Sequence, residues 1–115
     1  MADEEIIKRV FANKVYFIGG RDFGTWKNSK IKDTTNSFIE IYIDKFGEES
    51  FQELKAEFKM MNKEGLQKEY EIKVHFITDK GTNHTKKTGW DAYTVYKDAI
   101  EAIENQVFKS MGDYK

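Results

Sequence analysis

The stretch FIGGRDFGTWKNSK, residues 17–30, has the spacing of a phosphate-binding loop but lacks the side chains that such a loop needs. Gly19 and Gly24 fit the pattern G-x-x-x-x-G. Thr25 and Trp26 then occupy the positions where Lys and Ser or Thr would contact the phosphates and Mg²⁺. The sequence therefore argues against a nucleotide-binding P-loop, and we expect a glycine-bent connection that follows a strand.

Two segments of the chain combine cations with a tryptophan. Residues 21–32 carry four cations and one acid, and residues 80–90 carry three cations, a histidine and no acid. Each segment has a net charge of +3, although the whole chain has −1. Cations contact phosphates and an exposed ring stacks on bases, so these segments predict a site for single-stranded nucleic acid. The candidate residues are Arg21, Phe23, Trp26, Lys27, Lys30, Lys32, Lys80, His84, Lys86, Lys87 and Trp90.

The same residues also have a purely structural interpretation. Tryptophan is largely buried in most proteins, and lysine in a loop simply keeps a protein soluble. Trp90 directly precedes the predicted C-terminal helix, where its ring would pack that helix onto the sheet. The exposure of Trp26 and Trp90 therefore decides between the two interpretations.

The sequence shows no recognisable catalytic or metal-binding pattern. It has no cysteine, and its two histidines, His75 and His84, do not have the spacing of a zinc site. Its serines lack a nucleophile-elbow motif, and its acids form no recognisable catalytic pair. We therefore predict that the protein is not an enzyme and uses no cofactor and no metal.

Composition predicts one domain that spans residues 1–115. With 39% hydrophobic residues the chain can form a globular core, but it is too short for two cores. No apolar run approaches the roughly 20 residues of a membrane span, and the acidic N-terminal residues do not resemble a secretory signal. Together with the lack of cysteine, these features predict a cytoplasmic protein that does not bind membranes.

Apolar residues that alternate with polar ones predict the strands of a sheet. The segment 37–44 rests on Ile39, Ile41 and Ile43, which would share one face of a strand. We expect strands at residues 15–18, 37–44 and 70–78, and a polar loop at residues 79–89.

Residues 51–61 fit both a helix and a strand. A capping box at residues 50–53 favours the helix. A hairpin about Gly65 favours the strand, because one register satisfies both the apolar and the charge pairing. A helix would not need that match, so we favour the strand. The predicted pairs are Phe58 with Ile72, Ala56 with Val74, Leu54 with Phe76, Lys59 with Glu71, and Glu57 with Lys73.

Two amphipathic helices complete the predicted fold. Residues 94–111 have an apolar stripe and are followed by Gly112, which is a common helix stop. Residues 3–12 form a shorter predicted helix with acids at its N-terminus. The sequence thus predicts an α+β fold, in which an antiparallel meander of four to five strands is covered by the C-terminal helix. The stripe consists of Tyr96, Ala99, Ile100, Ile103, Val107 and Met111.

Two functions are compatible with these features. The first is a small non-catalytic binding protein of the inhibitor or immunity type, encoded by a phage or mobile element, with another protein as partner. It rests on the short, charge-rich chain without a catalytic motif and on aromatic residues that could anchor a partner. The alternative is single-stranded nucleic-acid binding through the two segments 21–32 and 80–90.

Overall fold

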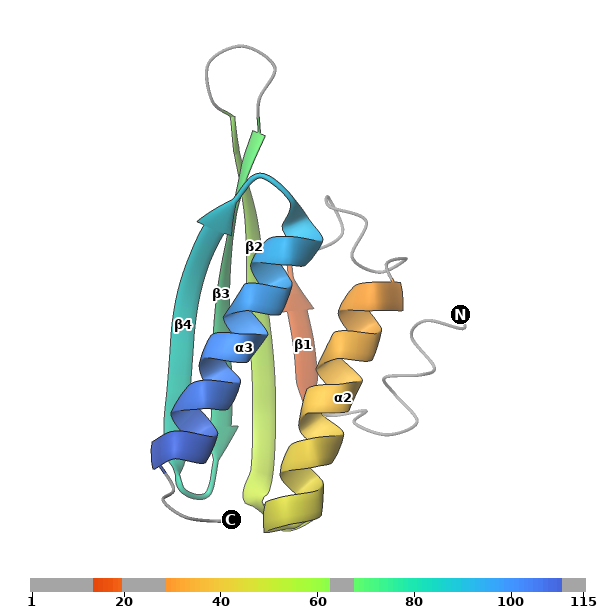
Figure 1. Ribbon diagram of the computed structural model, residues 1–115, viewed down its shortest axis with the longest axis vertical. Helices are drawn as coiled ribbons and strands as arrows, with labels where there is room; N and C mark the ends of the chain where they lie inside the picture. Colours follow the sequence, from red (N-terminus) through yellow and green to blue (C-terminus); the bar gives the residue numbers. More distant parts are fainter. Residues whose placement is uncertain (1–13, 20–28, 63–67, 111–115) are drawn as a thin grey trace.

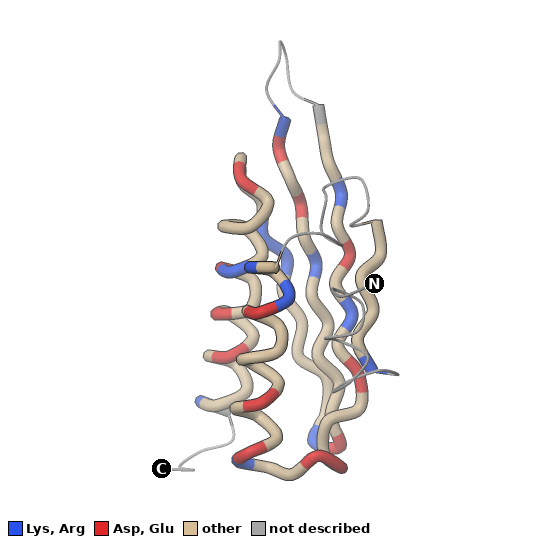
Figure 2. Tube along the Cα trace, turned by 90° about the vertical axis from the view of Figure 1, so that its right-hand side faces the viewer, with Lys and Arg blue, Asp and Glu red and all other residues tan. Residues whose placement is uncertain are grey.

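The protein is a four-stranded sheet with two helices packed on one of its faces (Figures 1 and 2). The computed structural model describes residues 14–19, 29–62 and 68–110, so the predicted helix at residues 3–12 lies outside the described residues. The strands are β1 (Val15–Ile18), β2 (Phe51–Asn62), β3 (Lys68–Thr78) and β4 (Gly81–Gly89), in that order across the sheet. The helices are α2 (Ser29–Phe46), the short 3₁₀ helix η3 (Glu48–Ser50) and α3 (Ala92–Ser110).

β1 is parallel to β2, so the sheet is mixed and the predicted all-antiparallel meander is only partly right. The chain leaves β1, passes through α2 and enters β2 in the same direction. Parallel neighbours need such a crossover, because a tight turn can only join antiparallel strands. The strands β2 and β3 form the expected antiparallel hairpin, β4 extends it as a further antiparallel strand, and α3 is the predicted C-terminal helix.

Residues 37–44, predicted as a strand, lie within α2. The alternation of isoleucines was misleading, because Ile39 and Ile43 are also separated by one helical turn. Ile39 is fully buried in the structure, whereas Ile41 is exposed. The buried side chains of α2 recur at intervals of three and four residues, as a helix packed on a sheet requires. They are Ile31, Lys32, Thr35, Phe38, Ile39 and Tyr42.

β2 confirms the strand that we favoured for residues 51–61. All five predicted cross-strand pairs with β3 are present, including Phe58 opposite Ile72 and Lys59 opposite Glu71. Leu54, Ala56 and Phe58 on β2 face the helices and are buried. Apolar pairing and charge pairing thus indicate the same register. That register is strongly specified, because a one-residue shift would move the apolar residues to the open face.

β4 corrects the predicted loop at residues 79–89. Its residues pair with β3 from Gly81, opposite Thr78, to Gly89, opposite Tyr70. Threonine is well suited to strands, but the segment has no apolar alternation because one of its faces is open and α3 covers the other only partly. Gln106 on α3 donates its side-chain amide to the His84 carbonyl at 3.1 Å, which keeps that part of the sheet edge from pairing with another strand.

The ring of Phe76 on β3 lies at the centre of the core. The helix α2 covers it with Phe38 and Tyr42, whose ring centroids are 4.8 and 5.0 Å from that of Phe76. On the sheet itself, Phe51 stacks on Phe76 at 5.5 Å. These aromatic contacts join α2 to both central strands.

A buried hydrogen bond joins the two helices. The Thr35 hydroxyl on α2 donates to the Ile31 carbonyl at 2.8 Å, so it accepts the hydrogen bond that it shares with the Tyr96 hydroxyl on α3. Both Thr35 and Tyr96 are fully buried. Burial raises the pKa of the Tyr96 phenol, and the hydrogen bond to Thr35 lowers it by less. Tyr96 therefore stays protonated and acts as the donor.

We expect Thr35→Val to reduce the free energy of unfolding by about 1–3 kcal/mol, because it leaves the buried Tyr96 hydroxyl without an acceptor. Adding Tyr96→Phe to that variant removes the unsatisfied group and should recover part of the loss. Urea unfolding of the two single variants and the double variant measures the coupling. Strictly additive losses in the double variant would show that this hydrogen bond does not stabilise the fold.

Asp91 caps the N-terminus of α3. Its Oδ2 accepts hydrogen bonds from the Thr94 backbone N–H at 2.9 Å and from the Thr94 hydroxyl at 2.7 Å. The side-chain hydrogen bond from Thr94 is the main reason that the pKa of Asp91 is lowered, followed by the backbone hydrogen bond. The carboxylate is thus favoured over the neutral acid in the folded protein.

We expect Asp91→Ala to cost about 1 kcal/mol of stability at neutral pH, because the cap is lost. Since the folded-state pKa is lowered, the carboxylate stabilises the fold above the unfolded-state pKa, and this contribution disappears as the pH falls through the folded-state value. Asp91→Asn keeps a capping side chain without a charge. Its stability should therefore approach that of the wild type in acid, and a constant difference across the acid range would contradict this account.

Candidate nucleic-acid interface

The sheet face opposite to the helices is open and carries charged side chains in rows across the strands. Side chains alternate between faces along each strand, so the neighbours of the buried residues point to this open face. Glutamates occur among the open-face residues of β2 and β3, whereas β4 has no acid at all. One row contains Lys55, His75 and His84, and the next contains Glu57, Lys73 and Lys86.

Lys73 and Lys86 are direct cross-strand neighbours on the open face, although both are positively charged. Like charges that face each other destabilise a sheet. Glu57 lies beside Lys73 on β2, but its carboxylate is approached by His75 at 3.4 Å and by Lys55 at 3.9 Å. Within the described part of the chain neither Lys73 nor Lys86 forms an ion pair, and both are exposed. Glu57 is thus the acid beside Lys73, but its carboxylate is engaged by His75 and Lys55.

His75 and His84 also face each other across β3 and β4, with their ring centroids 6.1 Å apart. Glu57 is the acid nearest to this pair, through its contact with His75. Across residues 14–19, 29–62 and 68–110, no three His, Cys, Asp or Glu side chains are grouped so that they could hold a metal ion. The histidines thus add further nitrogen donors to the face that carries Lys73 and Lys86.

Trp90 is 59% exposed at the end of β4, so the structural interpretation is wrong for this tryptophan. Val95, which is buried, packs the start of α3 against the sheet instead. The contact is so close that a Cβ on Gly89 would lie 2.8 Å from the Val95 Cγ2 atom. The indole of Trp90 is therefore accessible to a ligand. Trp26 lies outside the described residues.

Both helices begin at the same end of the sheet (Figure 1), and there Lys30 of the first basic segment lies near residues that follow the second. Lys30 belongs to the first turn of α2, and its Nζ lies 5.6 Å from the ring centroid of Tyr93, three residues after Trp90. Lys30 also contributes to the lowered pKa of Asp91. Lys30, one cation of the first segment, thus lies beside Tyr93, just after the second segment ends.

Some of the predicted residues do not belong to this surface. Lys32 is 1% exposed on the inner side of α2, so its side chain is not available to a partner. Lys80 lies at the other end of β4, where it pairs with Asp79 at 3.7 Å and its Nζ is 5.6 Å from the ring centroid of Phe46. The remaining predicted residues, Arg21, Phe23, Trp26 and Lys27, lie outside the described residues.

We define the basic surface as Lys73, His84 and Lys86 on the open face, with Trp90 and Lys30 at its end. The predicted residue Lys87 does not belong to it, because Lys87 pairs opposite the buried Ile72 and so points to the face that carries the helices. Lys73 was not among the predicted residues, because in the sequence it is paired only with Glu57. A turn predicted from the sequence at residues 79–81 could have shown that Lys73 belongs to this surface. Gly81 has a φ of 128°, a value that only glycine adopts readily, and a tight turn there predicts a strand antiparallel to β3. That strand would have placed Lys86 beside Lys73.

Comparison with known proteins returns no family for this chain: no family model matches it, and neither does the sequence of any curated protein. The described helices include none with the length and apolar character that crossing a membrane requires. The assessment of the basic surface therefore rests on the residues themselves.

We expect Lys86→Glu to increase the free energy of unfolding by about 0.2–1 kcal/mol, because it replaces repulsion with attraction opposite Lys73. Thr82→Glu is the matched control, since it adds an acid to β4 opposite Ile77. The gain in stability should shrink as salt is added, because salt screens both the repulsion in the wild type and the attraction in the variant. A Lys86→Glu variant no more stable than the control at low salt would mean that the two lysines do not repel each other.

Proposed function

We propose that the protein binds single-stranded nucleic acid, and RNA in particular, through the basic surface along β4. The observation that carries this proposal is the adjacent pair Lys73 and Lys86, which forms no ion pair with an acid within the described residues. Trp90, exposed at the end of the same strand, supports it. Phosphates are the natural partners of such lysines, and an exposed indole offers a stacking surface to a base.

Electrostatics explains why such a pair of lysines would be kept. The repulsion between Lys73 and Lys86 reduces the stability of the free protein. A phosphate backbone that crosses β3 and β4 would bring negative charge to both ammonium groups and release its own counterions. Binding would therefore reduce the electrostatic repulsion between the two lysines of the free protein.

The shape of the surface favours a single strand over a duplex. The two described helices have acids on their outer sides, including Asp33, Glu40 and Glu101, so neither offers a basic face to a major groove. An open sheet face with an aromatic side chain suits unstacked bases, and single-stranded RNA is often recognised in this way. This similarity is one of architecture, and we use it only to rank RNA before DNA.

The first function predicted from the sequence, binding to another protein, stays a prediction. Nothing on the basic surface favours it, because this surface has two adjacent lysines in place of the apolar centre that protein interfaces prefer. A protein partner would have to use another part of the molecule.

The proposal predicts salt-dependent quenching of Trp90 fluorescence by short RNA. In a Trp26→Phe background Trp90 is the only tryptophan, so its emission reports on the surface directly. Lys73→Gln with Lys86→Gln should lower the slope of log affinity against log salt by about 0.7 for each lysine. Trp90→Ala should cost about 1–3 kcal/mol of binding energy, measured by anisotropy of labelled RNA because the indole itself is removed. Lys109→Gln, in the last turn of α3, is the control and should leave binding unchanged.

Three oligonucleotides separate the possible ligands. Single-stranded RNA should bind most tightly, DNA of the same sequence more weakly, and duplex RNA least. Equal binding of RNA and DNA would restrict the proposal to stacking and charge, without contacts to the 2′-hydroxyl. Binding that the lysine and Trp90 variants do not change would refute the proposed surface.

A further inference from the structure

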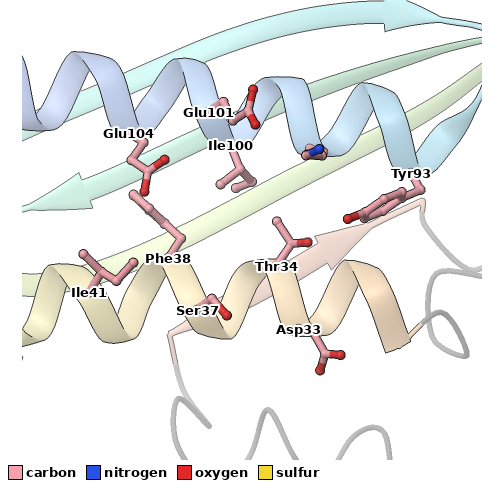
Figure 3. A pocket seen from close by; sticks show the side chains of 10 residues that line it. Asp33, Thr34, Ser37, Phe38, Ile41, Tyr93, Ile100, Glu101 and Glu104 are labelled. Atoms are coloured by element: carbon pink, nitrogen blue, oxygen red, sulfur yellow. The ribbon is translucent and has the colours of Figure 1, made fainter.

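The outer side of the helical layer has a groove between α2 and α3 with a volume of about 300 Å³ (Figure 3). Phe38 on α2 and Ile100 on α3 line its apolar part and are almost fully buried. Ile41 and Tyr93 extend the apolar lining toward the solvent, and Ile41 is 43% exposed. Ile41 thus continues the apolar lining of the groove onto the surface, and a contiguous apolar patch rimmed by polar residues is typical of a binding groove.

Acidic side chains surround this apolar lining. Asp33 on α2 and both Glu101 and Glu104 on α3 line the groove, and Lys97 is the only cation among the lining residues. Glu101 and Glu104 are one turn apart on the same helix, where like charges repel each other. Partial burial raises the pKa of Glu104, and the nearby Glu101 raises it further. Repulsion between these carboxylates and their partial burial thus destabilise the free protein, and a cationic partner would offset that destabilisation.

We propose that this groove binds an amphipathic helix of a partner protein, with apolar residues on one face and lysines or arginines beside them. A helix laid between α2 and α3 could insert apolar side chains at i, i+3 or i+4, and i+7 against Phe38, Ile41 and Ile100. Its cations would meet Asp33, Glu101 and Glu104. The acids would repel a phosphate backbone, so nucleic acid does not fit here.

A second copy of the chain does not supply this helix from its described residues. Both α2 and α3 pack their own apolar stripes against the sheet, through residues such as Ile39 and Ile103. Since the described helices of a second copy are already packed in this way, we assign the groove to a helix of a different protein. The groove lies on the outer side of the helices, whereas Lys73 and Lys86 lie on the open face of the sheet, so this inference does not depend on nucleic-acid binding there.

Two synthetic peptides of about four helical turns test the proposal. Both carry leucine at the i, i+3, i+4 and i+7 positions, and the remaining positions are lysine in one peptide and glutamate in the other. Fluorescence anisotropy of the labelled peptides gives the affinity, and ¹H–¹⁵N NMR of the full chain gives the location. We expect the lysine peptide to bind and to shift the amides around Ile41 and Ile100, and the glutamate peptide not to bind.

Variants with matched controls separate the groove from general attraction between opposite charges. Glu101→Gln with Glu104→Gln should weaken binding of the lysine peptide about three- to tenfold, since each exposed ion pair contributes modestly. Ile41→Ser should weaken it by a similar factor, because an apolar contact is lost. Glu40→Gln removes an acid of α2 that does not line the groove and should have no effect.

Two results would overturn the proposal. The first is binding of the lysine peptide that the Glu40→Gln control weakens as much as the groove variants do, because it would indicate attraction to net charge alone. The second is an absence of shifts at the groove amides when the peptide is saturating. Lys73→Gln with Lys86→Gln should leave peptide binding intact, so a failure here is distinct from a failure of the nucleic-acid proposal.

Discussion

The packing of α2 on Phe76 is the contact on which the rest of the structure depends. Phe38 and Tyr42 can cover that ring only if α2 lies across the centre of the sheet. In that position the helix connects β1 to β2 as a crossover and leaves room beside it for α3. Both helices therefore lie on one face of the sheet, and the charged side chains of β2, β3 and β4 lie on the other. The basic surface exists because the core is built on one side only.

Local pairing was predictable from the sequence, whereas features that depend on distant elements were not. The register of β2 on β3 followed from Leu54, Ala56 and Phe58, because a short hairpin brings these residues to their partners without help from elsewhere. The direction of β1 depends on the element that follows it. Once the isoleucines of residues 37–44 had suggested a strand in place of α2, an antiparallel β1 was the natural but incorrect conclusion.

The candidate site was predictable to a similar degree. The cations of residues 80–90 and the importance of Trp90 were recognisable from composition, but their arrangement was not. Lys73 joins the surface only because β4 pairs with β3, and Lys32 leaves it because α2 turns that side chain inward. Edge strands such as β4 are hard to recognise, since a polar strand with one open face has no hydrophobic period. The chemistry of a surface can thus be inferred before its geometry.

The parallel pairing of β1 has a consequence for the order in which the protein assembles. Val15 pairs with Leu54, on the far side of all of α2, whereas only a short connection separates β2 from β3 and β3 from β4. Closing the longer loop costs more entropy, so the meander forms more readily than the β1 contact does. A newly made chain emerges with β1 first but must wait for β2 before that strand can dock. Until β1 docks, one edge of β2 is uncovered, and Leu54 and Ala56 lack the neighbouring residues that β1 supplies.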